Sequence, residues 1–335
     1  MPIFNLNLAA LLAKLNTPLY LRAANNPLHM NSNNLTAMTY QLLGKSSLLV
    51  SKIGFGCMSL QPTQKDIPFL IDQAIDSGIN FFDTADLYDA GQNEINIGNA
   101  VHSKRNKIII ATKVGNQLRA DGTGWDWNPG KKYIIAAAEQ SLRRLKTDYI
   151  DLYQLHGGTI EDPIDETIEA FELLQQQGKI RYYGISSIRP NVIREYVQRS
   201  NIVSVMMQYS LADRRPEETC LQLLKKNNIG VLARGTVAGG LLAGKTAKPY
   251  LGLSEAEIMA VSKAVKATTL PDSNPAASAI RFALQHPAIT TAVVGVRTEV
   301  QLKEVLQAIG DGEISATALN TLKESIRCLY YEQHR

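Results

Sequence analysis

The stretch INFFDTADLY, residues 79–88, joins a short apolar segment to the polar side chains Asp83 and Tyr88. Its first half is a continuous apolar run and not a strict alternation, as expected of a strand that is buried on both faces. From about residue 40 onward, seven more runs can be read as strands: SKIGFG, KIIIATK, YIDLYQLH, IRYYGISS, VSVMMQYS, GVLARG and ITTAVVGV. The sequence therefore predicts eight strands, most of them buried on both faces.

Segments with helical periodicity lie between these runs, and several end at glycine or asparagine, the usual residues just past a helix C-terminus. Gly78 closes the first such segment and Gly178 closes a later one. Eight strands that alternate with helices predict an α/β fold of one domain, a parallel (β/α)8 TIM barrel. A doubly wound sheet is the alternative, but no GxGxxG follows the first strand, which disfavours a dinucleotide-binding unit of that type.

Two segments interrupt the alternation, and we expect them to form long loops over the C-terminal mouth of the barrel. Residues 115–130 follow the third strand and carry Trp125 and Trp127, which are candidates either for lining a pocket or for packing on the surface. Residues 236–273 follow the seventh strand. A last helix, near 314–330, is expected to pack across the barrel or to cap it.

Composition limits the possible functions. A net charge of +4 on 335 residues gives no case for a nucleic-acid partner, and no apolar run reaches the roughly 18 residues that span a bilayer. The three cysteines are widely spaced, which predicts reduced thiols in the cytoplasm and no metal site. Residues 1–37 are rich in Asn, Leu and Ala and are expected to be a disordered extension, so the barrel domain is assigned to 38–335.

Reactive side chains lie at or just beyond the ends of three predicted strands. Asp83 and Tyr88 follow the run INFF. Lys113 ends KIIIATK, and His156 ends YIDLYQLH. In a parallel barrel the C-terminal ends of the strands converge on one face, whatever their separation in the sequence. The sequence therefore predicts that these four side chains form one catalytic site.

Such a set of side chains is suited to delivering a proton. A free Tyr has a pKa of about 10, and an adjacent ammonium, here Lys113, stabilises its anion and moves that pKa toward neutrality. Asp83 can keep a buried Lys113 charged, and His156 can orient a substrate oxygen by a hydrogen bond. None of these side chains donates hydride, so a nicotinamide cofactor is the expected source of the electron pair.

These motifs resemble those of the aldo-keto reductases, in particular the bacterial members, over about residues 43–308. GINFFDTADLY resembles the signature with the catalytic Asp and Tyr, IIIATK the strand with the catalytic Lys, and YIDLYQLH the strand with the substrate-orienting His. The resemblance implies that Asp83, Tyr88, Lys113 and His156 are the catalytic residues. It also implies an (α/β)8 barrel that binds NADP(H) extended across its mouth.

The resemblance further implies a site for the nicotinamide carboxamide. GISS resembles the family's GxSN turn, where Ser186 matches and Ser187 stands in place of the usual Asn. Gln208 in MMQYS matches the glutamine that completes this site. Arg234 stands where many members have an aromatic residue that stacks on the nicotinamide. A guanidinium plane can also stack on a ring, but it brings a positive charge.

Two further segments are implied to hold the rest of the cofactor. GGLLAGK resembles the loop that closes over the pyrophosphate, with contacts from Gly239, Gly240, Leu241 and Lys245. VGVRTEVQLKEVL resembles the segment that binds the adenosine 2′-phosphate, with Gly295, Arg297 and Gln301 as its cofactor-binding residues. Arginine suits a phosphate through its fork of N–H donors. Val305 replaces an Asn that usually touches adenine, so the preference for NADPH over NADH is expected but weakened.

The function expected from the resemblance is the NADPH-dependent reduction of an aldehyde or ketone, with Tyr88 as the proton donor. The reaction is reversible, so a sugar or alcohol dehydrogenase is the same site working in the other direction. The alternative is an NADPH-binding regulatory or redox-sensing subunit with slow turnover. The sequence does not identify the physiological substrate, and it leaves the oligomeric state open.

Overall fold

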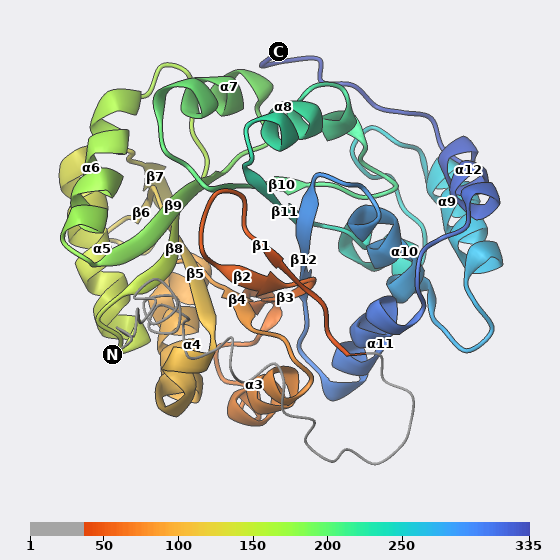
Figure 1. The fold of residues 1–335 in the computed structure, drawn as a ribbon, viewed down its shortest axis with the longest axis horizontal. Coiled ribbons are helices and arrows are strands. Elements are labelled where there is room, and N and C mark those ends of the chain that lie inside the picture. The colour runs from red at the N-terminus through yellow and green to blue at the C-terminus, as the bar shows by residue number, and fades with distance from the viewer. Residues whose placement is uncertain (1–36) are drawn as a thin grey trace, which may run out of the picture. The chain divides into compact units, whose positions relative to one another are not determined.

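The computed structural model describes residues 37–335, which fall in one compact unit, Leu35–Arg335. The predicted extension, 1–37, lies almost entirely outside the described residues. The chain forms a closed barrel of eight parallel strands, which confirms the predicted barrel over the doubly wound sheet (Figure 1). In barrel order from the first in sequence, the strands are β3 (Ile53–Gly56), β4 (Phe81–Asp83), β5 (Ile109–Val114), β8 (Ile150–Leu155), β9 (Ile180–Ser186), β10 (Ser204–Gln208), β11 (Gly230–Arg234) and β12 (Ile289–Gly295).

Helices follow the strands and surround the barrel (Figure 1). The α-helices are α3 (Ile67–Asp76), α4 (Gln92–Val101), α5 (Lys131–Leu145), α6 (Ile164–Gln176), α7 (Pro190–Arg199), α8 (Cys220–Lys226), α9 (Glu255–Thr268), α10 (Pro275–Leu284), α11 (Glu299–Gly310) and α12 (Ala316–Glu324). Short 3-10 segments are η1 (Cys57–Ser59), η2 (Tyr88–Gly91), η3 (His102–Lys107), η4 (Arg215–Glu217) and η5 (Ala238–Ala243). Among residues 37–335, no helix is both long and apolar enough to span a bilayer.

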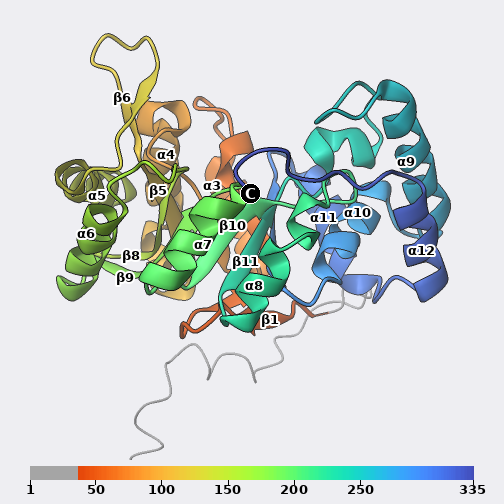
Figure 2. The same cartoon turned by 90° about the horizontal axis from the view of Figure 1, so that it is seen from above.

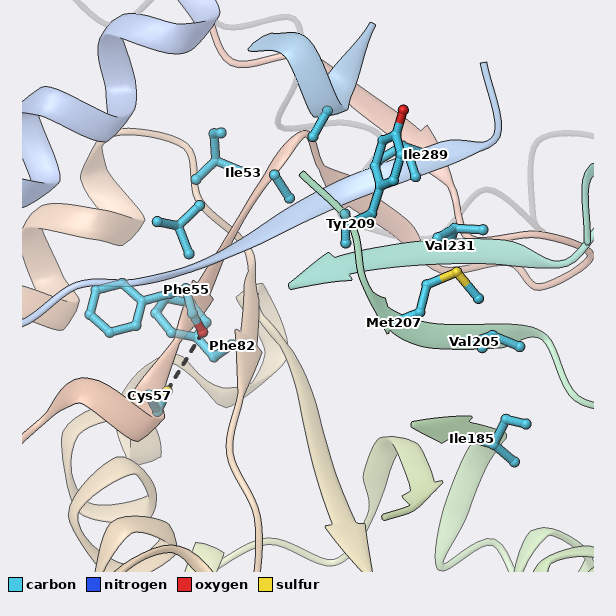
Figure 3. Close-up of a cluster of buried hydrophobic side chains, with 14 of the residues drawn as sticks. Ile53, Phe55, Cys57, Phe82, Ile185, Val205, Met207, Tyr209, Val231 and Ile289 are labelled. Atoms are coloured by element: carbon cyan, nitrogen blue, oxygen red, sulfur yellow. Dashed lines mark hydrogen bonds between the residues drawn. The ribbon is translucent and has the colours of Figure 1, made fainter. Parts of the chain in front are cut away.

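Alternate residues along the strands build two separate apolar clusters, because successive side chains of a strand point to opposite faces. The inner cluster fills the barrel and includes Phe81, Ile109, Ala111, Leu152, Met206 and Leu232. The outer cluster packs the strands against the helices and includes Phe55, Phe82, Ile110, Tyr153, Met207 and Val231. Figure 3 shows part of the outer cluster, where the rings of Phe55 and Phe82 stack at a centroid distance of 5.6 Å.

A hairpin that was not predicted closes the N-terminal end of the barrel. Its strands are β1 (Tyr40–Leu42) and β2 (Leu49–Ser51), paired antiparallel. Leu43, Leu48 and Val50 are buried in the inner cluster, so the hairpin and the turn between its strands close the N-terminal end of the barrel interior. Figure 2 shows β1 and the segment around β6 at opposite ends of the barrel, which leaves the C-terminal end as the mouth.

The two long loops follow β5 and β11 as predicted, and both contain regular structure. Residues 115–130 include an antiparallel hairpin of β6 (Asn116–Leu118) and β7 (Trp125–Trp127). Trp127 packs on Gly115 and Gly157, and its indole Nε1 donates to Asp162 at 2.9 Å. The loop after β11 contains η5 and α9, and α12 packs against α9.

Candidate active site

The alternation of the inner cluster continues into polar residues at the mouth of the barrel. Asp83, Lys113 and Gln154 each stand two residues after a member of that cluster, so their side chains face the barrel interior. His156 continues this series just beyond the end of β8. Tyr88 comes from η2, after β4. Packing of the interior thus delivers polar groups from separate strands to one place.

The Lys113 ammonium lies at the centre of this group and is almost fully buried. Its Nζ donates to Asp83 Oδ2 at 2.7 Å, to the backbone oxygen of Thr84 at 2.7 Å and to the Tyr88 hydroxyl at 3.1 Å. The second oxygen of Asp83 accepts a hydrogen bond from Gln154 Nε2 at 3.3 Å. Asp83, Tyr88 and Lys113 therefore meet as the sequence predicts.

The charges of the group follow from this geometry. Burial by itself lowers the pKa of Lys113, but the Asp83 carboxylate and the Tyr88 oxygen outweigh burial and hold that pKa above its ordinary value. Burial raises the pKa of Tyr88, and the opposing charge of Lys113 only reduces the rise. The expectation that Lys113 lowers the pKa of Tyr88 below its ordinary value is therefore wrong, because the effect of burial is larger than the effect of the Lys113 charge. Tyr88 keeps its proton at neutral pH and is set up as a donor.

His156 stands beside the phenol. The two rings meet edge to face, with centroids 5.9 Å apart and an angle of 80°. Burial, followed by the charges of Lys113 and Arg234, lowers the pKa of His156 to about 3, so the imidazole is neutral. Its Nδ1 is buried without a hydrogen-bond partner in the described part of the chain. A neutral imidazole carries one N–H, which can donate to a substrate oxygen.

Residues of the expected carboxamide site lie at the ends of consecutive strands. Ser186 ends β9, Gln208 ends β10 and Arg234 ends β11. Ser187 follows Ser186, and both serines are buried. The Gln208 amide donates to the Tyr250 hydroxyl at 2.9 Å and accepts from Arg234 at 3.2 Å. These strands are neighbours in the barrel, so the residues form one arc of the mouth.

The expected pyrophosphate loop coincides with η5. Gly239 and Gly240 have φ values of 66° and 96°, in the left-handed region. Leu241 is buried, and the exposed Lys245 folds back so that its Nζ donates to the oxygen of Gly239 at 2.9 Å. The φ of Gly240 is one that side-chain-bearing residues rarely adopt, and the Lys245 side chain packs against this glycine.

The expected 2′-phosphate segment follows β12. Gly295 ends the strand beside Ser59, with which a Cβ would collide. Arg297 is exposed, and within residues 37–335 its guanidinium makes no ion pair or hydrogen bond. The Gln301 side chain accepts from the backbone N–H of Arg297 at 3.0 Å. Val305 is buried in the outer cluster, so the apolar residue at this position serves packing.

Asp86 and Glu94 lie close to Tyr88 in the sequence, and both carboxylates are buried. Glu94 accepts from the Thr112 hydroxyl at 2.5 Å and from Arg144 Nε at 2.6 Å. Asp86 lines a cavity of about 290 Å³ with Arg144 and Tyr133, and its Oδ1 has no hydrogen-bond partner among the described residues. The sequence signal for both is their closeness to Tyr88, but their burial depends on contacts with α5.

Replacing Asp86 with asparagine is expected to stabilise the protein above pH 7. Burial, followed by the charge of Glu94, raises the pKa of Asp86 to about 7. The folded state therefore binds this proton more tightly than the unfolded state, and the wild type loses stability as the pH rises from about 4 to 7. We expect Asp86→Asn to gain on the order of 1–3 kcal/mol at pH 8. Denaturant unfolding at several pH values measures this gain.

The control for this prediction is Asp89→Asn, which removes an exposed carboxylate from the same turn. It is expected to leave the pH dependence of stability unchanged. A gain for Asp86→Asn that is equally large at pH 4 and pH 8 would contradict the assignment of a titrating buried carboxyl.

The model of the aldo/keto reductase family matches residues 52–327. Among curated proteins, the chain is 48% identical over 310 residues to the uncharacterized oxidoreductase YqkF of Bacillus subtilis, an alignment that covers 89% of this chain and all of YqkF. It is 33% identical over 228 residues to the aldo-keto reductase YhdN of the same organism, with 64% and 66% of the two chains covered.

Among solved structures, the fold is similar to that of aldo-keto reductase AKR11C1 from Bacillus halodurans. The holo form of that protein superimposes with a TM-score of 0.83 at 47% sequence identity, with 89% of this chain and 99% of that chain covered. Its apo form gives a TM-score of 0.75 over the same shares.

Proposed function

The chain belongs to the aldo/keto reductase family of oxidoreductases, and from this premise we propose that it reduces an aldehyde or a ketone at the expense of NADPH. The observation that supports this most directly is the hydrogen bond between Lys113 Nζ and the Tyr88 hydroxyl, inside a buried ion pair with Asp83. This hydrogen bond supports the role of Tyr88 as the residue that gives its proton to a carbonyl oxygen. The partner is therefore a small carbonyl compound, or the corresponding alcohol in the reverse direction.

Each residue has a distinct part in this reaction. NADPH, when bound, supplies the hydride. The neutral His156 ring donates a hydrogen bond that fixes the carbonyl oxygen. Tyr88 transfers its proton to that oxygen as negative charge develops there, and Lys113 stabilises the phenolate that remains. Asp83 keeps Lys113 charged, because a buried ammonium without a carboxylate tends to lose its proton.

The arc from β9 to β12 fits a nicotinamide dinucleotide by its chemistry. Gln208 and Ser186 offer both donors and acceptors, as a carboxamide requires. Two consecutive left-handed glycines, Gly239 and Gly240, carry no side chain that would obstruct a phosphate at this loop. The exposed guanidinium of Arg297, which has no partner within residues 37–335, suits an additional phosphate.

The proposal is tested by NADPH consumption with purified protein against a panel of aldehydes, ketones and sugars. Turnover of any of them supports a reductase and begins to define the substrate pocket. Tight NADPH binding without turnover across the panel would favour a regulatory subunit. The cytoplasmic location suggested by the widely spaced cysteines remains a prediction that cell fractionation would test.

Replacing Arg297 with alanine is expected to weaken NADPH binding about 10- to 100-fold and NADH binding less than about twofold. Only NADPH carries the 2′-phosphate, and the loss of a charge-assisted hydrogen bond to it costs about 1.5–3 kcal/mol. Fluorescence titration with both cofactors measures the two affinities. The control is Lys303→Ala, which removes an exposed cation of α11 paired with Glu299. Equal losses for NADPH and NADH would remove Arg297 from the phosphate site.

A further inference from the structure

Two threonines flank the buried ion pair of the site on the opposite face of the strands. Thr84 directly follows Asp83, and Thr112 directly precedes Lys113. Because side chains alternate along a strand, these threonines point away from the barrel interior and toward the helices. Both are completely buried. A buried hydroxyl requires a hydrogen-bond partner, and the partner of each is informative.

Both partners come from the first turn of α4, from adjacent residues. The Thr84 hydroxyl bonds to Asn93 Oδ1 at 2.7 Å, and the Thr112 hydroxyl donates to Glu94 Oε1 at 2.5 Å. Asn93 also donates to the backbone oxygen of Cys57, the residue that follows β3, at 2.9 Å. One helical turn therefore holds three neighbouring strands, two of them beside a residue of the catalytic group.

The same turn of α4 is connected to the third member of the group. Only three residues separate Tyr88 from the start of α4, and all three have positive φ values: 50° for Asp89, 53° for Ala90 and 89° for Gly91. Two of them are not glycine. Such backbone costs about 1–3 kcal/mol per strained residue, and it persists only where the surroundings impose it.

Arg144 of α5 lies against this turn. A Cβ on Gly91 would lie 2.8 Å from Arg144 Cδ, so the arginine packs directly on the turn. Arg144 Nε donates to Glu94 at 2.6 Å, and a second guanidinium nitrogen donates to Ser141 at 3.2 Å. The Glu94 carboxylate is thereby bonded both to the strand that carries Lys113 and to the residue that supports the Tyr88 turn.

We propose that Asn93 and Glu94 are positioning residues, which set the Tyr88 hydroxyl against the Asp83–Lys113 pair by fixing the start of α4 to β4 and β5. The proposal rests on the reductase function proposed above. It also gives a reason for a fully buried carboxylate at the contact between α4 and the strands. A buried ion pair contributes little net stability, so its use is to specify one arrangement of the groups around it.

The hydrogen bonds from the strands to Asn93 and Glu94 are best removed by substituting the threonines, because substitution of Glu94 would leave Arg144 without this carboxylate partner. Thr112→Val and Thr84→Val delete one hydroxyl each at constant shape, whereas Thr112→Ser and Thr84→Ser keep it. The matched control is Thr167→Val in α6, which deletes a fully buried hydroxyl that donates to the oxygen of Pro129 at 2.8 Å. All five variants lose some stability if they fold, so stability does not discriminate among them.

Steady-state kinetics and NADPH binding are expected to separate positioning from mere stability. Misplacing the phenol by a fraction of an ångström to 1 Å is expected to lower kcat about 10- to 100-fold in both valine variants. The Kd of NADPH should stay within about twofold, because the cofactor arc is on other strands. The serine variants should recover kcat to within about threefold, and Thr167→Val should keep it. The pKa that governs kcat should shift in the valine variants only.

Two results would overturn the proposal: unchanged kcat and pH profile in Thr84→Val and Thr112→Val, or an equal loss of kcat in Thr167→Val. If one valine variant does not fold, the other decides. A readout without turnover keeps the test separate from the proposed function. In protein labelled with 13Cζ-tyrosine, the Tyr88 signal, assigned by its loss in Tyr88→Phe, should shift in the valine variants and not in Thr167→Val. This chemical-shift change would show that the threonine contacts position the Tyr88 phenol, even if the wild type reduces no carbonyl compound.

Discussion

Replacing Tyr88 with phenylalanine is expected to lower kcat for carbonyl reduction about 1,000-fold or more, with less than about a twofold change in the Kd of NADPH. The substitution keeps the ring, which packs against His156, and removes only the hydroxyl that Lys113 contacts at 3.1 Å. A positioned acid contributes about 10²–10⁴ in rate, and this substitution removes the hydroxyl that is proposed to act as that acid. Single-turnover kinetics at saturating NADPH measure the chemical step directly.

The matched control is Tyr182→Phe, which removes a hydroxyl bonded to Ser47, between β1 and β2 at the closed end of the barrel. It should leave kcat within about twofold of the wild type. Full turnover by Tyr88→Phe would show that another group delivers the proton and would withdraw Tyr88 from the mechanism.

The second large effect is expected for Lys113→Met, in which both activity and stability fall. Among residues 37–335, the Asp83 carboxylate would lose its charged hydrogen-bond partner and keep the Gln154 amide, at 3.3 Å. Breaking a buried pair by removing one partner costs about 3–5 kcal/mol, because the other charge remains buried. We also expect kcat to fall about 1,000-fold or more, since the phenolate of Tyr88 loses its counter-charge.

A double variant separates these two causes. Asp83→Asn/Lys113→Met removes both charges, so it should regain most of the lost stability in urea unfolding and stay inactive. A double variant less stable than Lys113→Met would contradict the idea that the stranded carboxylate causes the loss. Recovery of activity in the double variant would show that the lysine is not needed to stabilise the phenolate.

Much of this structure could be predicted because the strands are short, apolar and buried on both faces. The eight predicted strands are those of the barrel, and Asp83 and Lys113 meet because each lies at the mouth end of its strand. The signal was local: a polar residue immediately after an apolar run.

The features that were missed depend on contacts between distant segments. The hairpin of β1 and β2 is short, and its role depends on which side chains enter the barrel. The burial of Glu94 depends on Arg144, fifty residues further along the chain. The pKa of Tyr88 depends on the balance between its desolvation and one nearby charge, which a sequence pattern does not reveal. The roles of the cofactor residues remain predictions, although their positions on neighbouring strands agree with them.

The hairpin of β1 and β2 closes the N-terminal end of the barrel, and side chains fill the interior from there up to the reactive groups. In the described part of the chain, these packed side chains separate the Lys113 ammonium from the N-terminal end of the barrel. Molecules that enter the site through the C-terminal mouth would also leave through it, so arrival and departure would compete for the same opening. A compound lodged at that opening would block entry and exit together, which makes slow release of a bound molecule a natural limit on the rate of the whole cycle.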